Sequence, residues 1–108
     1  MIIPFTVTPE VETYLAQTLS HPPVGDFEAA LVWTTRYIID DHDVGPALTI
    51  GYYPIGTRSP DSFFSLAGHS VSIVRATLDK LAGKELVFEH RIVGVEGSKH
   101  SVKVLSAK

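Results

Sequence analysis

The sequence predicts an α+β domain in which an N-terminal helix and one short helix pack on a mixed or antiparallel β-sheet. Three observations predict this class: a helix start near residue 9, long alternating runs after residue 27, and a strand, helix and strand between residues 69 and 89. The chain has 108 residues, which is near the commonest domain size. We therefore expect a single domain over residues 1–108.

The N-terminal helix is predicted to begin at Thr8-Pro9-Glu10, after a short edge strand over Ile2 to Val7. Threonine is a favourable N-cap, proline suits the first turn, and an acidic side chain interacts favourably with the positive helix end. We expect four residues at helical spacing to form the buried face: Val11, Tyr14, Leu15 and Leu19. His21-Pro22-Pro23 is expected to end the helix.

Residues Phe27 to Ile39 show the period-two alternation of a strand, and we expect this to be the longest strand of the chain. A polar segment from Asp40 to Pro46 follows, and Ala47 to Ile55 again has the pattern of a strand. The two strands are predicted to form an antiparallel hairpin. Pro54 places the end of the second strand, a bulge or a sheet edge at that position.

The stretch from His69 to Glu89 changes from strand to helix and back. Alternating apolar residues predict a strand up to Ile73, and Gly83 is expected to end the following helix in a left-handed cap. Three apolar residues are predicted to form the buried side of that helix: Val74, Leu78 and Leu81. Leu86 to Phe88 predicts the next strand, and a closing strand is expected near Val102 to Leu105.

Composition excludes several classes of function. The chain contains no cysteine, so disulfides, thiolate catalysis and cysteine-ligated metals or clusters are excluded. A net charge of −3 gives no electrostatic reason to expect a nucleic-acid or anionic-membrane partner. The sequence shows no long apolar span and no signal-type N-terminus, which favours a soluble cytoplasmic protein.

The acidic segment Asp40-Asp41-His42-Asp43 is the densest cluster of side chains able to bind metal. Carboxylates and an imidazole suit a divalent cation, so Asp40, His42 and Asp43 are candidate ligands. Neighbouring residues of an extended segment point to opposite faces, so these side chains converge only if the backbone turns sharply. The alternative is a solvated acidic hairpin turn.

A small-ligand pocket is a second candidate site, formed by Trp33, Tyr53 and Arg58 next to the loop from Gly56 to Ser62. In the alternative interpretation the aromatic residues fill the core and Arg58 orders a turn. Tyr14 lies at helical spacing, and we expect it to pack in the core rather than contact a ligand. The sequence contains no Gly-x-Ser-x-Gly element and no glycine-rich phosphate loop.

The order of elements resembles the HesB-like or A-type carriers of iron–sulfur cluster biogenesis. The resemblance is carried by five short motifs: Asp61-Ser-Phe-Phe64, Gly68, Val71-Ser-Ile73, Leu81-Ala-Gly83 and Leu86-Val-Phe88. In that family, cysteines in a turn after the first long strand and in a Cys-x-Cys pair after the last strand hold the cluster. This chain has neither, so the resemblance implies a HesB-like fold without a cluster or other cofactor.

We therefore predict a HesB-like domain without cluster ligands that acts as a non-enzymatic binding or accessory protein. An exposed strand edge or apolar patch would pair it with a protein partner or with a second copy of itself. Two alternatives stay open at this point. One is a divalent-metal-binding protein that uses the Asp40–Asp43 turn, and the other is a small-ligand enzyme with its pocket near Trp33, Tyr53 and Arg58.

Overall fold

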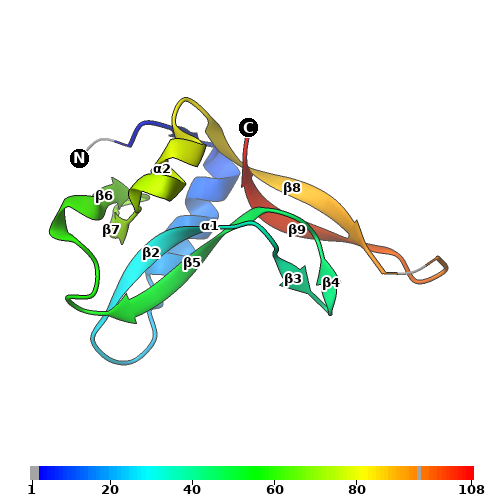
Figure 1. Ribbon diagram of the computed structural model, residues 1–108, viewed down its shortest axis with the longest axis horizontal. Helices are drawn as coiled ribbons and strands as arrows, with labels where there is room; N and C mark the ends of the chain where they lie inside the picture. The colour runs from blue at the N-terminus through cyan, green and yellow to red at the C-terminus, as the bar shows by residue number, and fades with distance from the viewer. Residues whose placement is uncertain (1–2, 95) are drawn as a thin grey trace.

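The computed structural model describes residues 3–94 and 96–108. It confirms the α+β class, with two α-helices and a mixed seven-stranded sheet in the order β1-β8-β9-β5-β2-β7-β6 (Figure 1). The α-helices and the strands of this sheet are α1 (Pro9–Leu19), α2 (Arg75–Leu81), β1 (Thr6–Val7), β2 (Phe27–Thr34), β5 (Ala47–Pro54), β6 (Phe63–Leu66), β7 (His69–Ser72), β8 (Glu85–Val93) and β9 (His100–Ala107). A separate two-stranded pair is formed by β3 (Ile38–Ile39) and β4 (His42–Asp43), and a 3₁₀ turn, η1, spans Pro60–Ser62.

Helix α1 begins as predicted. Thr8 is its N-cap, and the Thr8 hydroxyl accepts a hydrogen bond from the backbone N–H of Val11 at 3.4 Å. Leu15 is fully buried at the centre of the apolar face. The prediction that Tyr14 belongs to the buried face was wrong, because its side chain is 44% exposed. Its ring lies at the border of the apolar face and meets the ring of Phe88 edge-on.

Strand β1 lies at one edge of the sheet and pairs in parallel with β8, Thr6 opposite Glu85 and Val7 opposite Leu86. An edge strand was predicted over Ile2 to Val7, and Ile2 lies outside the described residues. The strand that the structure describes begins only at Thr6. Its last two residues thus lead directly into the Thr8 cap, which fixes the start of α1 against β8.

Strands β2 and β5 form the predicted antiparallel hairpin, with Phe27 opposite Pro54 and Thr34 opposite Ala47. Pro54 is the last residue of β5, as its missing N–H favours. The prediction of one strand from Phe27 to Ile39 was wrong, because β2 ends at Thr34 and β8, with nine residues, is longer. Residues 38 and 39 turn aside and pair with β4 instead.

The segment between His69 and Glu89 forms β7, α2 and the start of β8, as predicted. Gly83 adopts a φ of 74°, the left-handed conformation expected at the end of the helix. Leu81 is fully buried, whereas Val74 is 39% exposed and precedes α2 as its N-cap. Val74 therefore does not belong to the buried face of the helix, contrary to the prediction.

A single hydrophobic core joins both helices to the sheet. It includes Leu15 of α1, Leu81 of α2 and the facing strand residues Leu31, Leu48 and Leu105. The β8–β9 hairpin continues past this core as an arm, and the β3–β4 pair lies beside it (Figure 1).

Arg91 of β8 connects the arm to the β3–β4 segment through hydrogen bonds from Nη1 to the backbone oxygens of Val44 and Pro46. On β9, His100 lies 3.7 Å from the carboxylate of Asp40. Arg91 and His100 lie on the same face of the arm as the buried Val104, because their register partners alternate in step. The β3–β4 segment therefore packs on the face of the arm that is opposite to α1.

Candidate functional site

Strands β5 and β9 are neighbours in the sheet, yet they are in register at one position only, Leu48 opposite Leu105. Strand β9 pairs with β8 along its whole length, from His100 to Ala107. Within the described residues, the other edge of β9 therefore has no strand partner over residues 100–104. Unpaired backbone N–H and C=O groups at such an edge are ready to bind a further strand.

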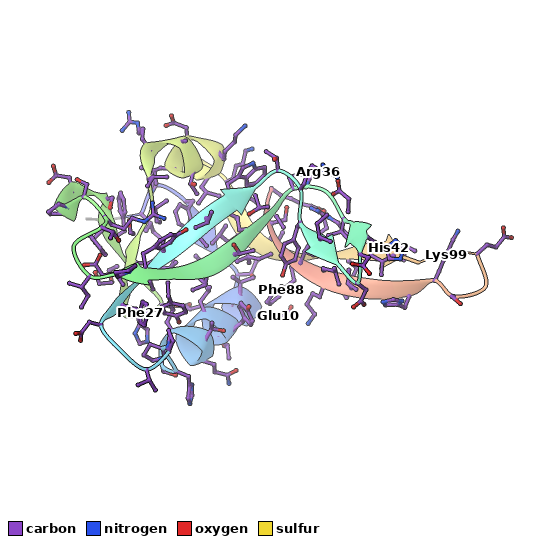
Figure 2. The ribbon with its side chains drawn as sticks, turned by 60° about the horizontal axis from the view of Figure 1, so that its bottom comes forward. Glu10, Phe27, Arg36, His42, Phe88 and Lys99 are labelled. Atoms are coloured by element: carbon purple, nitrogen blue, oxygen red, sulfur yellow. The ribbon has the colours of Figure 1, made fainter. Side chains whose placement is uncertain are left out.

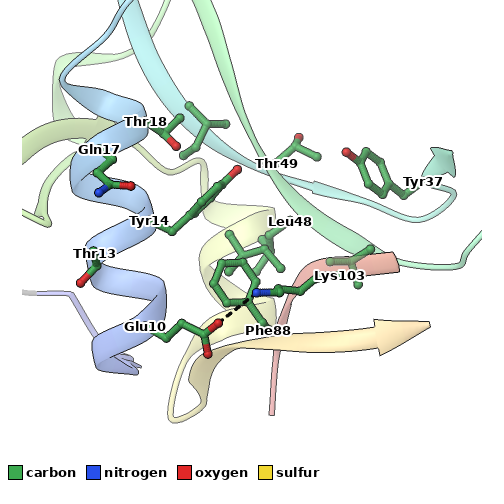
Figure 3. A pocket seen from close by; sticks show the side chains of 13 residues that line it. Glu10, Thr13, Tyr14, Gln17, Thr18, Tyr37, Leu48, Thr49, Phe88 and Lys103 are labelled. Atoms are coloured by element: carbon green, nitrogen blue, oxygen red, sulfur yellow. Dashed lines mark hydrogen bonds and ion pairs between the residues drawn. The ribbon is translucent and has the colours of Figure 1, made fainter. Parts of the chain in front are cut away.

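A cleft of about 550 Å³ lies where the two strands diverge, between α1, β5 and β9 (Figure 3). Its volume falls within the range of small-ligand and peptide sites. Thirteen residues line it: Glu10, Thr13, Tyr14, Gln17, Thr18, Tyr37, Leu48, Thr49, Ile50, Phe88, Lys103, Val104 and Leu105. They come from five separate parts of the chain, which the fold brings together.

The inner wall of the cleft is apolar. Leu48 and Leu105 belong to the core, and Ile50 and Phe88 are partly buried against it. The rings of Tyr14 and Phe88 stand edge to face, with centroids 5.3 Å apart and planes at 78°. This geometry is favourable for an aromatic pair and holds the Tyr14 ring as one side of the cleft.

One end of the cleft carries a pair of opposite charges. Lys103 Nζ lies 3.1 Å from Glu10 Oε1 and 4.9 Å from the centroid of the Phe88 ring. Figures 2 and 3 show Glu10 of α1 beside Phe88, with Lys103 reaching toward both. The side chains of Lys103 and Glu10 are 47% and 66% exposed, so their ion pair is weak and a charged ligand group can replace either partner.

Two tyrosines supply polar groups to the cleft. Tyr14 projects from α1 and Tyr37 from the segment after β2, and their hydroxyls point into the cleft from opposite sides (Figure 3). Tyr52, by contrast, donates its hydroxyl hydrogen to the backbone oxygen of Thr18 at 3.4 Å. The cleft therefore combines an apolar wall with hydroxyl groups at its mouth.

The acidic segment is a solvated hairpin turn. Asp40 and Asp41 have φ values of 49° and 63° and connect β3 to β4. Asp43 accepts hydrogen bonds from the backbone N–H of Gly45 at 2.8 Å and from Arg36 Nε at 2.9 Å. These two bonds hold the pKa of Asp43 below its usual value.

The predicted metal ligands Asp40, His42 and Asp43 are not brought together by this turn. Asp40 faces His100 of β9, while Asp43 is engaged by Arg36. In the ranges 3–94 and 96–108, no group of three or more histidine, aspartate or glutamate side chains is placed to hold a metal ion. Metal binding at this turn therefore stays a prediction without geometric support.

The predicted pocket of Trp33, Tyr53 and Arg58 is not formed as one site. Trp33 lies opposite Leu48 and Tyr53 lies opposite Glu28 in the β2–β5 register. Trp33 and Tyr53 therefore point to opposite faces of the sheet, since side chains alternate along each strand. Arg58 does meet Tyr53, with its guanidinium carbon 3.8 Å from the ring centroid. Trp33 instead faces α2, where Lys80 lies 5.8 Å from its ring centroid.

No family model, curated protein or solved structure matches the chain. The resemblance to HesB-like carriers therefore stays a prediction based on the order of short motifs. In the part of the chain that the structure describes, no helix is long and apolar enough to span a membrane.

Proposed function

We propose that this protein is a non-enzymatic binding protein that holds an extended peptide segment of a partner in the cleft between α1, β5 and β9. The observation that carries the proposal is the pairing of β5 with β9 at a single position, which leaves the edge of β9 unpaired over residues 100–104 inside a cleft. Addition of a strand to such an edge is a common mode of peptide recognition. A HesB-like ancestry is not required for this function.

The backbone of β9 supplies the affinity in this proposal. A peptide lying along residues 100–104 directs every second N–H and C=O group toward β9, as an edge strand does in any sheet. Strand β8 holds the opposite side of β9 through the whole hairpin, so the acceptor edge is already ordered before binding. Preorganisation of this kind reduces the entropy lost on association.

The side chains of the cleft supply the specificity. A peptide side chain that points inward meets Leu48, Ile50 and Phe88, which favours an apolar or aromatic residue. A charged residue nearer the end of the cleft is met by Lys103 or Glu10, depending on its sign. The sites for alternate peptide residues are therefore chemically different, as required for recognition by strand addition.

Selection of a random heptapeptide library displayed on phage tests the proposal. Enriched peptides are synthesised, and their binding site is mapped from backbone amide shifts in ¹⁵N NMR spectra. We expect the largest shift changes in residues 101–104 and in Tyr14. Selection on the Tyr14→Ala variant serves as the counter-screen, and Ile92→Ala, an exposed position on β8, is the matched control.

Methylation of the peptide backbone distinguishes strand addition from side-chain docking alone. N-methyl groups on the alternate amides that face β9 are expected to abolish binding, whereas methyl groups on the other alternate set are tolerated. Equal tolerance of both sets would refute strand addition. Enriched peptides whose shift changes map away from the cleft would refute the site itself.

A further inference from the structure

We infer that a second pocket, between β2 and β7, binds a primary ammonium group. These two strands are parallel neighbours in register at one position, Ala30 opposite Ser72, and a pocket of about 310 Å³ lies beside their first residues. Nine residues line it: Leu19, Pro22, Phe27, Glu28, Ala29, Tyr52, Phe63, His69 and Ser70. None of them lines the peptide cleft, and Figure 2 shows Phe27 well away from Glu10 and Phe88.

Glu28 gives this pocket its charge preference. It is the one carboxylate among the lining residues, which include no lysine or arginine. The Oε2 atom of Glu28 is buried and has no hydrogen-bond partner in the described ranges of the chain. A buried acceptor without a donor is unfavourable, and a ligand that brings an N–H group relieves that cost. Positive charge on the same group strengthens the bond.

Three aromatic side chains favour a cation at the same place. Phe27, Tyr52 and Phe63 line the pocket, and the face of an aromatic ring attracts a cation through its quadrupole. The Tyr52 hydroxyl donates to Thr18, so it is already engaged in a hydrogen bond. The rings and the short apolar side chains around them also suit an alkyl chain. The combined chemistry is that of an alkylammonium ion with N–H donors, in contrast to a quaternary ammonium ion.

Arg58 is the cation of the chain that competes with such a ligand. Glu28 and Tyr53 are register partners and share a face of the sheet, and Arg58 stacks on Tyr53. The Nε atom of Arg58 is also buried without a hydrogen-bond partner in the described residues. Glu28 and Arg58 nevertheless form no ion pair within 4.0 Å. The experiment must therefore separate ligand binding from an internal pairing of these two side chains.

NMR titration with three small probes tests the inference. We expect n-butylammonium to produce saturable shift changes at Glu28, Phe63 and Ser70. Tetramethylammonium, which lacks N–H groups, and n-butanol, which lacks charge, are each expected to bind at least about ten-fold more weakly. Equal affinity for n-butanol and n-butylammonium would overturn the inference. Saturable shifts confined to another part of the molecule would overturn it as well.

Two variants complete the test. Glu28→Gln keeps the shape of the side chain and is expected to weaken n-butylammonium binding at least about ten-fold, whereas Glu12→Gln on the exposed face of α1 leaves it unchanged. Arg58→Gln is expected to leave the affinity unchanged or to raise it, and its effect on unfolding should add to that of Glu28→Gln. Unchanged affinity in Glu28→Gln would overturn the inference. Strong non-additivity between the two variants would show an internal Glu28–Arg58 pair instead, and would also overturn it.

Discussion

Leu48 of β5 and Leu105 of β9 lie opposite each other at the single position where these two strands are in register. Both side chains are buried in the core, 3% and 6% exposed. The contact holds the β8–β9 hairpin to the rest of the sheet, while the strands on one side of it open into the cleft. The same pair therefore joins the two parts of the sheet and forms the inner wall of the candidate site.

Replacement of Tyr14 is expected to weaken peptide binding without unfolding the protein. Its side chain is 44% exposed, so Tyr14→Ala removes little buried area, yet it deletes one wall of the cleft. We expect affinity for an enriched peptide to fall about ten-fold or more, in line with the loss of an aromatic contact residue. Isothermal titration calorimetry measures this effect. Tyr14→Phe separates the ring from the hydroxyl, and full affinity in Tyr14→Ala would exclude the cleft as the site.

Replacement of Arg91 is expected to destabilise the fold by about 2 kcal/mol. Its side chain is only 16% exposed, contacts Glu89 at 2.7 Å, and donates to two backbone oxygens of the β3–β4 segment. Arg91→Met keeps the apolar part of the side chain but leaves these acceptors unpaired. Urea unfolding provides the measurement.

The matched control for Arg91 is Arg75→Met. Arg75 pairs with Asp79 one helical turn away, and both side chains are largely exposed, 86% and 68%. An exposed pair of this type contributes less than about 1 kcal/mol. If the two arginine variants lost equal stability, the anchoring role of Arg91 would be refuted.

Acid is expected to weaken the same network through Glu89. Hydrogen bonds from Arg91 and Lys108 lower the pKa of Glu89 below its usual value of 4.5. A carboxylate with a lowered folded-state pKa contributes stability that is fully present above the unfolded pKa and is lost as the pH falls through the folded pKa. The free energy of unfolding should thus decrease below about pH 4.5. Glu89→Gln should show a smaller decrease over this range in urea titrations, and an identical pH profile would contradict the assignment.

The Thr8 cap is expected to contribute about 1 kcal/mol to stability. Its hydroxyl accepts the hydrogen bond from the Val11 N–H, one of the four unpaired donors at the start of α1. Thr8→Ala removes that acceptor and is expected to lower the melting temperature by several degrees. Thr8→Ser retains the acceptor and serves as the control. Equal loss in both variants would assign the effect to the threonine methyl group.

The amino-acid sequence by itself determined the local elements. Thr8-Pro9 starts α1, Gly83 ends the turn after α2, and the alternating runs form the β2–β5 hairpin. These features depend on neighbours within one or two turns of the chain, where capping, backbone sterics and alternation act directly. The end of β2 at Thr34 was not predictable from alternation, because the apolar pattern continues to Ile39 while the chain forms a second hairpin.

Only the tertiary structure decided where side chains from distant segments meet. Trp33 and Tyr53 were expected in one pocket, but the register of β2 and β5, set across an irregular connection, places them on opposite faces. The cleft combines residues near positions 10, 37, 50, 88 and 103, and it exists because β5 and β9 diverge beyond Leu48 and Leu105. Strand register and divergence depend on the packing of the whole core, which no short pattern in the chain encodes.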